Sequence, residues 1–140
     1  MRNLFLAMMA TAMTLLPLRA DAQGKGGAAD AIRAVISDQI AAFQADDLEA
    51  AFDFASPVIR RRFGTPGRFG AMVRQGYPMV WRPAKVSFLD LERRDGGPWQ
   101  PVLLRGPAGA LFIVDYQMVR VSGAWKINAV HVRKASGASA

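Results

Sequence analysis

The sequence contains no cysteine and only one histidine, His131. Without cysteine there is no disulfide scaffold, no thiol chemistry and no thiolate metal site. A metal site would then need carboxylate ligands, and no spacing of Asp or Glu indicates one. We therefore expect no metal. We interpret His131 as a structural residue, and the alternative that it acts as a general base stays open.

The signatures of common enzymes are also missing. The chain has no Gly-x-Ser-x-Gly elbow, phosphate loop, dinucleotide fingerprint or His-Glu-x-x-His motif. The stretch "GTPGRFG" (64–70) is rich in glycine, but its proline marks the start of a helix rather than a phosphate cradle. We expect no cofactor, and the composition favours a non-catalytic protein over an enzyme.

Long hydrophobic runs are absent beyond Leu4–Leu16, which is shorter than the roughly 20 residues needed to span a bilayer. Arg2 precedes this run, and Ala20-Asp21-Ala22 forms a small-x-small cleavage site before Gln23. The pattern predicts a signal peptide over residues 1–22 and a periplasmic location. The alternative is an uncleaved membrane anchor. A lipoprotein anchor is excluded because no cysteine follows the run.

Acidic residues are in the minority, and the formal net charge is +7. Losing residues 1–22 removes two arginines and one aspartate, which leaves +6. The basic residues are dispersed and match no nucleic-acid-binding motif, so we expect no nucleic-acid partner. The charge favours a weak contact with an anionic membrane surface.

The rest of the chain is long enough for one domain, and 51% of the sequence is hydrophobic, which suffices for a core. We expect a flexible linker at 23–29, a single domain at 30–134 and a disordered tail at 135–140.

Helix signals fill the first half of the domain. A helix is predicted from Asp30, and three short helices should follow, starting at Asp46 or Asp47, at Ser56-Pro57 and at Thr65-Pro66. The apolar residues at helical spacing in the first helix are Ile32, Val35, Ile36, Ile40 and Phe43.

Strand signals fill the second half, after Tyr77. Ser122-Gly123 is a tight hairpin turn. The predicted strands are 84–92, 99–105, 110–121 and 124–133. Helices followed by an antiparallel meander predict an α+β fold, with N-terminal helices packed on a curved, cone-like sheet of about four strands.

Three short stretches carry a resemblance that extends over about residues 30–133: "FGTP" (63–66), "GYP" (76–78) and "GAWKIN" (123–128). The chain resembles a family of small secreted bacterial proteins known as a domain of unknown function. That family is similar in turn to SnoaL-like and ketosteroid-isomerase-like cone (cystatin-like) folds. The resemblance implies a fold and no activity, because such folds host isomerases, hydratases and binding modules.

Three consecutive arginines, Arg60 to Arg62, lie in the helix predicted after Ser56. At 100° per residue, Arg60 and Arg61 point away from the apolar stripe and Arg62 falls within it. Arg62 must either extend to the surface or pair with an acid such as Asp90 or Asp115. An anion-binding role in the mouth of the cone is the alternative.

Alternation along the strand at 110–121 places Asp115 and Gln117 on one face and Tyr116 on the other. Asp115 on an apolar face could act as a general base, but an ion pair with an arginine is the favoured interpretation. In the last strand, His131 is expected to share a face with Trp125, Ile127 and Ala129.

Two functions stay open. The favoured one is a secreted, non-catalytic module that binds a small molecule or an envelope protein, through Arg62, Tyr77, Trp81 and Gln117. The alternative is a small cofactor-independent isomerase or hydratase with Asp115 as base, assisted by Tyr116 or His131. A homodimer through the outer sheet face is a further alternative.

Overall fold

We analysed a computed structural model, which describes residues 25–135. The signal peptide predicted at 1–22 and most of the tail predicted at 135–140 lie outside the described residues. The elements are α1 (Lys25–Gln44), α2 (Leu48–Asp53), α3 (Pro57–Phe63), α4 (Pro66–Gly76), α5 (Pro78–Trp81), β1 (Lys85–Phe88), β2 (Glu92–Arg94), β3 (Gly97–Arg105), β4 (Leu111–Val121) and β5 (Ala124–Lys134).

The predicted helix starts at 56 and 65 are confirmed, and of the two alternatives for the second helix the structure has Asp47. The side chains of Asp47, Ser56 and Thr65 each accept a hydrogen bond from the backbone N–H three residues later. Pro57 and Pro66 occupy the first turns of α3 and α4. These residues satisfy N–H groups that a helix cannot pair within itself, so the local sequence is enough to set where each helix begins.

The first helix is longer than expected. It begins at Lys25, so most of the segment predicted as a linker over 23–29 is helical. Ala28 and Ala29 favour helix, and the stretch continues directly into an amphipathic segment that packs on the core. The two glycines at 26 and 27 therefore do not stop the helix.

Two differences follow Tyr77, where only strands were expected. Residues Pro78–Trp81 form the short helix α5, which has the same proline start signal as α3 and α4. The strand expected at 84–92 is divided into β1 and β2, and both pair with β3. The break lies opposite Pro101, which has no N–H to donate to a neighbouring strand.

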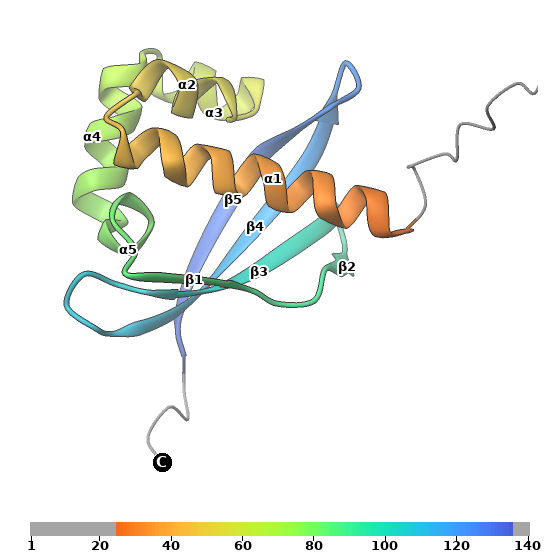
Figure 1. The fold of residues 1–140 in the computed structure, drawn as a ribbon. Coiled ribbons are helices and arrows are strands. Elements are labelled where there is room, and N and C mark those ends of the chain that lie inside the picture. The colour runs from red at the N-terminus through yellow and green to blue at the C-terminus, as the bar shows by residue number, and fades with distance from the viewer. Residues whose placement is uncertain (1–24, 136–140) are drawn as a thin grey trace, which may run out of the picture.

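The fold is α+β, as predicted, with the helices before an open antiparallel sheet. The sheet has five strands among the described residues rather than about four, in the order β1-β3-β4-β5 with β2 also on β3. The helices cover one face of the sheet (Figure 1). We call this the inner face, and the opposite side the outer face.

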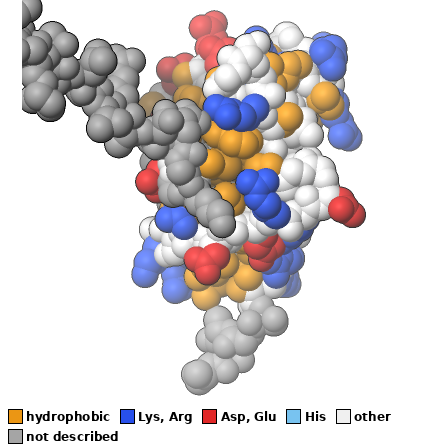
Figure 2. Space-filling model, turned by 90° about the vertical axis from the view of Figure 1, so that its right-hand side faces the viewer, with side chains coloured by type: hydrophobic (Ala, Val, Ile, Leu, Met, Phe, Trp, Pro, Cys, Tyr) orange, Lys and Arg blue, Asp and Glu red, His pale blue; other side chains and the backbone are white. Residues whose placement is uncertain are grey.

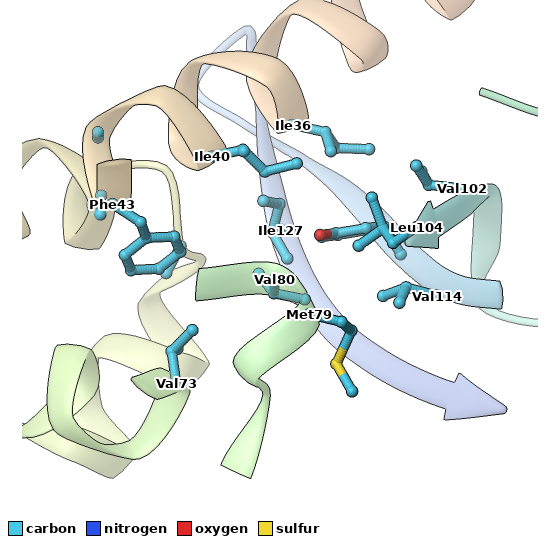
Figure 3. Packing of buried hydrophobic residues seen from close by; sticks show 14 of the residues in the cluster. Ile36, Ile40, Phe43, Val73, Met79, Val80, Val102, Leu104, Val114 and Ile127 are labelled. Carbon is cyan, nitrogen blue, oxygen red and sulfur yellow. The ribbon is translucent and has the colours of Figure 1, made fainter. Parts of the chain in front are cut away.

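The core lies between α1, α4, α5 and the inner face (Figure 3). Ile36, Ile40 and Phe43 of α1 meet Val114 of β4 and Ile127 of β5 in this layer. Phe43 is fully buried, and its ring lies 5.8 Å from the Phe69 ring and 5.5 Å from the Trp81 ring. The helical periodicity of α1 thus identified its buried face correctly.

A β-bulge at Asn128 changes which side chains of β5 share a face. Met118 pairs with Ile127, whereas Gln117 pairs with Ala129, so Asn128 is the extra residue. Simple alternation put Trp125, Ile127, Ala129 and His131 on one face, and this prediction was wrong. Ile127 belongs to the core, while His131 stands opposite Asp115 on the outer face.

Candidate functional site

A cavity of about 510 Å³ lies between the helical layer and β5. Its walls are mainly apolar and come from α1, α3, α4 and the edge strand β5. Its volume is in the range that holds a small ligand or a bulky side chain. Its apolar side chains include Phe43, Ile59, Phe63, Phe69, Met72, Val73, Val80, Ile127 and Val130.

Tyr116 lines this cavity from the inner face of β4, and its hydroxyl is the most unusual polar group of the site. The side chain is 0% exposed, and the hydroxyl has no hydrogen-bond partner. Burial raises the pKa of Tyr116 far above its ordinary value, so the group stays a neutral phenol. A buried hydroxyl without a partner is costly, and native structures rarely keep one without a reason.

Other polar groups around the cavity are already engaged. Gln39 donates from Nε2 to the Ala51 carbonyl oxygen at 3.1 Å. Asn128 interacts through Oδ1 with the Ser56 hydroxyl at 2.8 Å, and its Nδ2 donates to Gln117 Oε1 at 3.1 Å. These bonds hold the bulge of β5 against the start of α3. Sequence reasoning missed the roles of Gln39 and Asn128: Gln39 stands in no motif, and Asn128 lies in the "GAWKIN" stretch, which implied a fold but no contact for this side chain.

Arg62 lies at the cavity on the exposed side of α3. It forms no ion pair within the described residues, so the partners suggested for it, Asp90 and Asp115, are not its partners. Its guanidinium carbon lies 6.0 Å from the centroid of the Phe63 ring. The long side chain therefore follows apolar surface and keeps its charge in water.

The remaining arginines of the run do not form a basic patch. Arg60 and Arg61 are exposed, and Arg60 lies 3.8 Å from an Asp53 carboxylate oxygen. On the face shown in Figure 2, Lys and Arg side chains alternate with acidic and hydrophobic ones.

Asp115, the proposed general base, lies on the outer face and does not line the cavity. Its carboxylate accepts two hydrogen bonds from Arg133, at 2.9 and 3.3 Å, and Arg94 lies 3.7 Å away. Hydrogen bonding to Asp115 raises the pKa of Arg133. The interpretation of Asp115 as one member of an ion pair is confirmed. The described lining residues include no Asp or Glu.

His131 also differs from the expectation. Its ring lies 5.1 Å from the Trp99 ring on the outer face, and its strand position borders the rim of the cavity. The guanidinium of Arg94 lies over the Trp99 ring, 5.2 Å from its centroid. The set suggested for acid/base chemistry is thus divided, with Tyr116 on the inner face and Asp115 and His131 on the outer one.

The four residues suggested for ligand binding are divided as well. Arg62 and Tyr77 line the cavity. Trp81 packs against Phe43 in the core, and Arg82 lies over its ring. Gln117 lies on the outer face, where its Nε2 donates to the Gly96 carbonyl oxygen at 3.3 Å.

No group of three or more His, Cys, Asp or Glu side chains within residues 25–135 could hold a metal ion. None of the helices in that part of the chain is long and apolar enough to cross a membrane.

Comparison with known proteins identifies a family whose function is unknown. The family model described as "Domain of unknown function (DUF4864)" matches residues 27–140. The comparison with curated proteins finds no match. Among solved structures, Aln2 from a Streptomyces species is similar at 16% sequence identity and a TM-score of 0.48. The similarity covers 76% of this chain and 90% of Aln2.

Proposed function

We propose that this chain, which belongs to the DUF4864 family, is an exported binding module whose cavity accepts an apolar group. One observation carries the proposal: a mainly apolar cavity of about 510 Å³ whose described lining includes Tyr116 and Arg62 and no acidic residue. The apolar walls would supply most of the affinity for an occupant, and Arg62 would favour an occupant with a negative charge.

The architecture supports the same proposal at the level of the fold. We propose that the helices and sheet form a cone of the SnoaL-like kind, with the cavity in its mouth. The enzyme alternative receives no comparable support. Its carboxylate base is outside the cavity and held by two arginines, so a general base within reach of an occupant would have to be a different residue.

Export is part of the proposal and rests on the sequence alone. Residues 1–22 carry the charged, apolar and small-x-small segments of a signal peptide. Fractionation of the source cells, followed by N-terminal sequencing, should recover a periplasmic protein that starts at Gln23. Recovery of an intact N-terminus in the membrane fraction would favour the anchor instead.

The binding proposal is tested by blocking the cavity. Ile59 lines it from α3, whereas the neighbouring Val58 is 57% exposed and does not line it. We expect the fluorescent apolar anion 1-anilinonaphthalene-8-sulfonate to bind the mature protein saturably at one site. Ile59→Trp should weaken that binding at least tenfold, and the matched control Val58→Trp should leave it unchanged.

Equal dye binding by both variants would contradict the proposal, because the dye would then occupy another surface. Native mass spectrometry of protein purified gently from its own compartment gives an independent check. A reproducible extra mass that Ile59→Trp abolishes would identify the natural occupant of the cavity.

A further inference from the structure

The cavity extends from the inner face of the sheet to the edge of β5. Its lining includes five consecutive residues of this strand, from Ile127 to His131. Successive side chains of a strand point to opposite faces, so five in a row cannot all reach the cavity with their side chains. What borders the cavity along this stretch is the edge of the strand, with its backbone groups.

The backbone groups at this edge can be assigned from the register. Ala135 donates its N–H to the Leu111 carbonyl oxygen, which makes that residue pair a hydrogen-bonded one. Because such pairs alternate along an antiparallel ladder, Ala129, His131 and Arg133 bond to β4. The N–H and C=O groups of Val130, Val132 and Lys134 therefore point away from the sheet.

The same edge is already used once by the chain itself. Ile127 donates its N–H to the Phe54 carbonyl oxygen at 2.9 Å and accepts from the Ser56 N–H at 2.8 Å, in a parallel bridge. Pro57 then starts α3, and the chain leaves the edge. No described segment pairs with the outward groups of Val130 and Val132. Figure 1 shows this end of β5 running beyond the helical layer.

The surroundings indicate what could continue the pairing. The cavity beside Val130 offers room for an apolar side chain. Arg62 at the cavity and Lys134 at the end of the edge are exposed cations, and no described lining residue is acidic. An extended peptide would supply backbone groups for the edge, alternate apolar side chains for the cavity and acidic residues for the two cations.

We infer that β5 and the cavity together bind an extended, apolar and acidic peptide segment of a partner protein, which adds a strand to the sheet at Val130 and Val132. The inference rests on the proposed function and names the class of its occupant. A small molecule in the same cavity and a second copy of this chain at the same edge are the outcomes that would overturn it.

The test begins with a phage-displayed library of random 12-residue peptides, selected on the mature protein. Enriched sequences should combine alternating apolar residues with Asp or Glu. A synthetic peptide of the enriched sequence should bind with a measurable Kd and displace 1-anilinonaphthalene-8-sulfonate, because both occupy the cavity. Raising the salt concentration should weaken the binding of the peptide, because salt screens the attraction between its acidic residues and the cations Arg62 and Lys134.

The decisive variant is Val130→Pro, with Val130→Thr as its matched control. Proline removes an N–H that points away from β4, so an edge strand tolerates it, whereas threonine keeps the N–H and the branched shape. We expect Val130→Pro to raise the Kd of the synthetic peptide roughly tenfold or more. Val130→Thr should change that Kd little. If circular dichroism shows that Val130→Pro is unfolded, Val132→Pro tests the next free N–H.

The failures are distinguishable. If the dye binds at one cavity site but no peptide is enriched, or peptides bind the proline variant like wild type, the inference is wrong and the proposed function stands. If sedimentation shows that the wild type is a dimer and that Val130→Pro is a monomer, the edge of β5 binds a second copy of the chain. If the dye does not bind at the cavity, the proposed function itself is wrong.

Discussion

Asp115 and Tyr116 are neighbours on β4 whose side chains lie on opposite faces of the sheet, and their buried polar groups differ in how they are satisfied. On the outer face, Asp115 is buried but accepts from Arg133 and lies near Arg94. On the inner face, one residue further along β4, Tyr116 is buried more deeply and its hydroxyl has no partner. The Asp115 carboxylate is satisfied within the chain, whereas no described group forms a hydrogen bond with the Tyr116 hydroxyl.

We assign a structural role to Asp115 on the outer face, and the proposed binding role belongs to the cavity on the inner side. A paired carboxylate on the outer face holds strands β2, β4 and β5 together and offers little unused hydrogen-bonding capacity. An orphan hydroxyl beside a cavity costs stability that only a bound partner or water can recover. Four variants, each with a matched control, test this contrast, and the first has the largest expected effect.

The largest effect should come from the core that supports the inner face. Phe43 is fully buried, so Phe43→Ala should reduce the free energy of unfolding by about 3–5 kcal/mol. Leu89→Ala is the control, since Leu89 is 36% exposed and should cost under about 1 kcal/mol. Urea denaturation measures both. Similar losses would show that the inner layer is not tightly packed.

The next effect concerns the outer face. Asp115→Asn keeps the shape but removes the charge that both arginines share, and we expect a loss of about 1–2 kcal/mol in urea. Asp53→Asn provides the surface comparison, because that carboxylate is 69% exposed and 3.8 Å from Arg60. It should change stability by at most about 0.5 kcal/mol. If both variants lower the free energy of unfolding equally, Asp115 does not have the structural role assigned to it.

Tyr116→Phe should act in the opposite direction. Removal of an unsatisfied buried hydroxyl should stabilise the ligand-free protein by about 1 kcal/mol. The wild type should also lose stability above pH 10, the ordinary pKa of tyrosine, because the unfolded phenol ionises there while the folded one stays protonated. The advantage of Tyr116→Phe should then grow by about 1.4 kcal/mol per pH unit.

Urea denaturation at pH 7 and at pH values above 10 measures this effect. Tyr77→Phe serves as the control, since Tyr77 is only partly buried. A destabilised Tyr116→Phe at pH 7 would mean that the hydroxyl has a partner such as a bound water, and the contrast between the faces would disappear.

The smallest effect on stability should come from Arg62→Gln, because this side chain is exposed and makes no ion pair in the described part of the chain. We expect a change within about 0.5 kcal/mol. Binding of 1-anilinonaphthalene-8-sulfonate should nevertheless fall several-fold, since Arg62 is a cation at the cavity. Arg61→Gln, on the same helix but outside the cavity, should leave dye binding unchanged.

Much of the fold could be predicted from local signals. Ser56-Pro57 and Thr65-Pro66 mark helix starts through their own side chains and ring geometry, which need no distant partner. Ser122 and Gly123 both have positive φ, 51° and 82°, as a two-residue hairpin turn requires. The helical spacing of Ile32, Ile36, Ile40 and Phe43 likewise identified the buried face of α1.

The candidate site was less predictable, because it depends on pairings between distant segments. The bulge at Asn128 follows from how β4 and β5 pair, and it moved His131 to the outer face. Other contacts also join different elements of the fold. The side chains of Arg33 and Gln100 donate to the Leu89 carbonyl oxygen, and Arg133 donates to Asp115.

Capping, turn geometry and periodicity act within a few residues, so the local sequence was enough to place helices before an antiparallel sheet, to set the starts of α3 and α4 and to define the buried face of α1. Only the tertiary structure decided that Asp115 pairs with Arg133, that the Tyr116 hydroxyl lacks a partner and that a cavity opens along the edge of β5. These features arise where segments far apart in the chain meet, and their geometry depends on all of those segments at once.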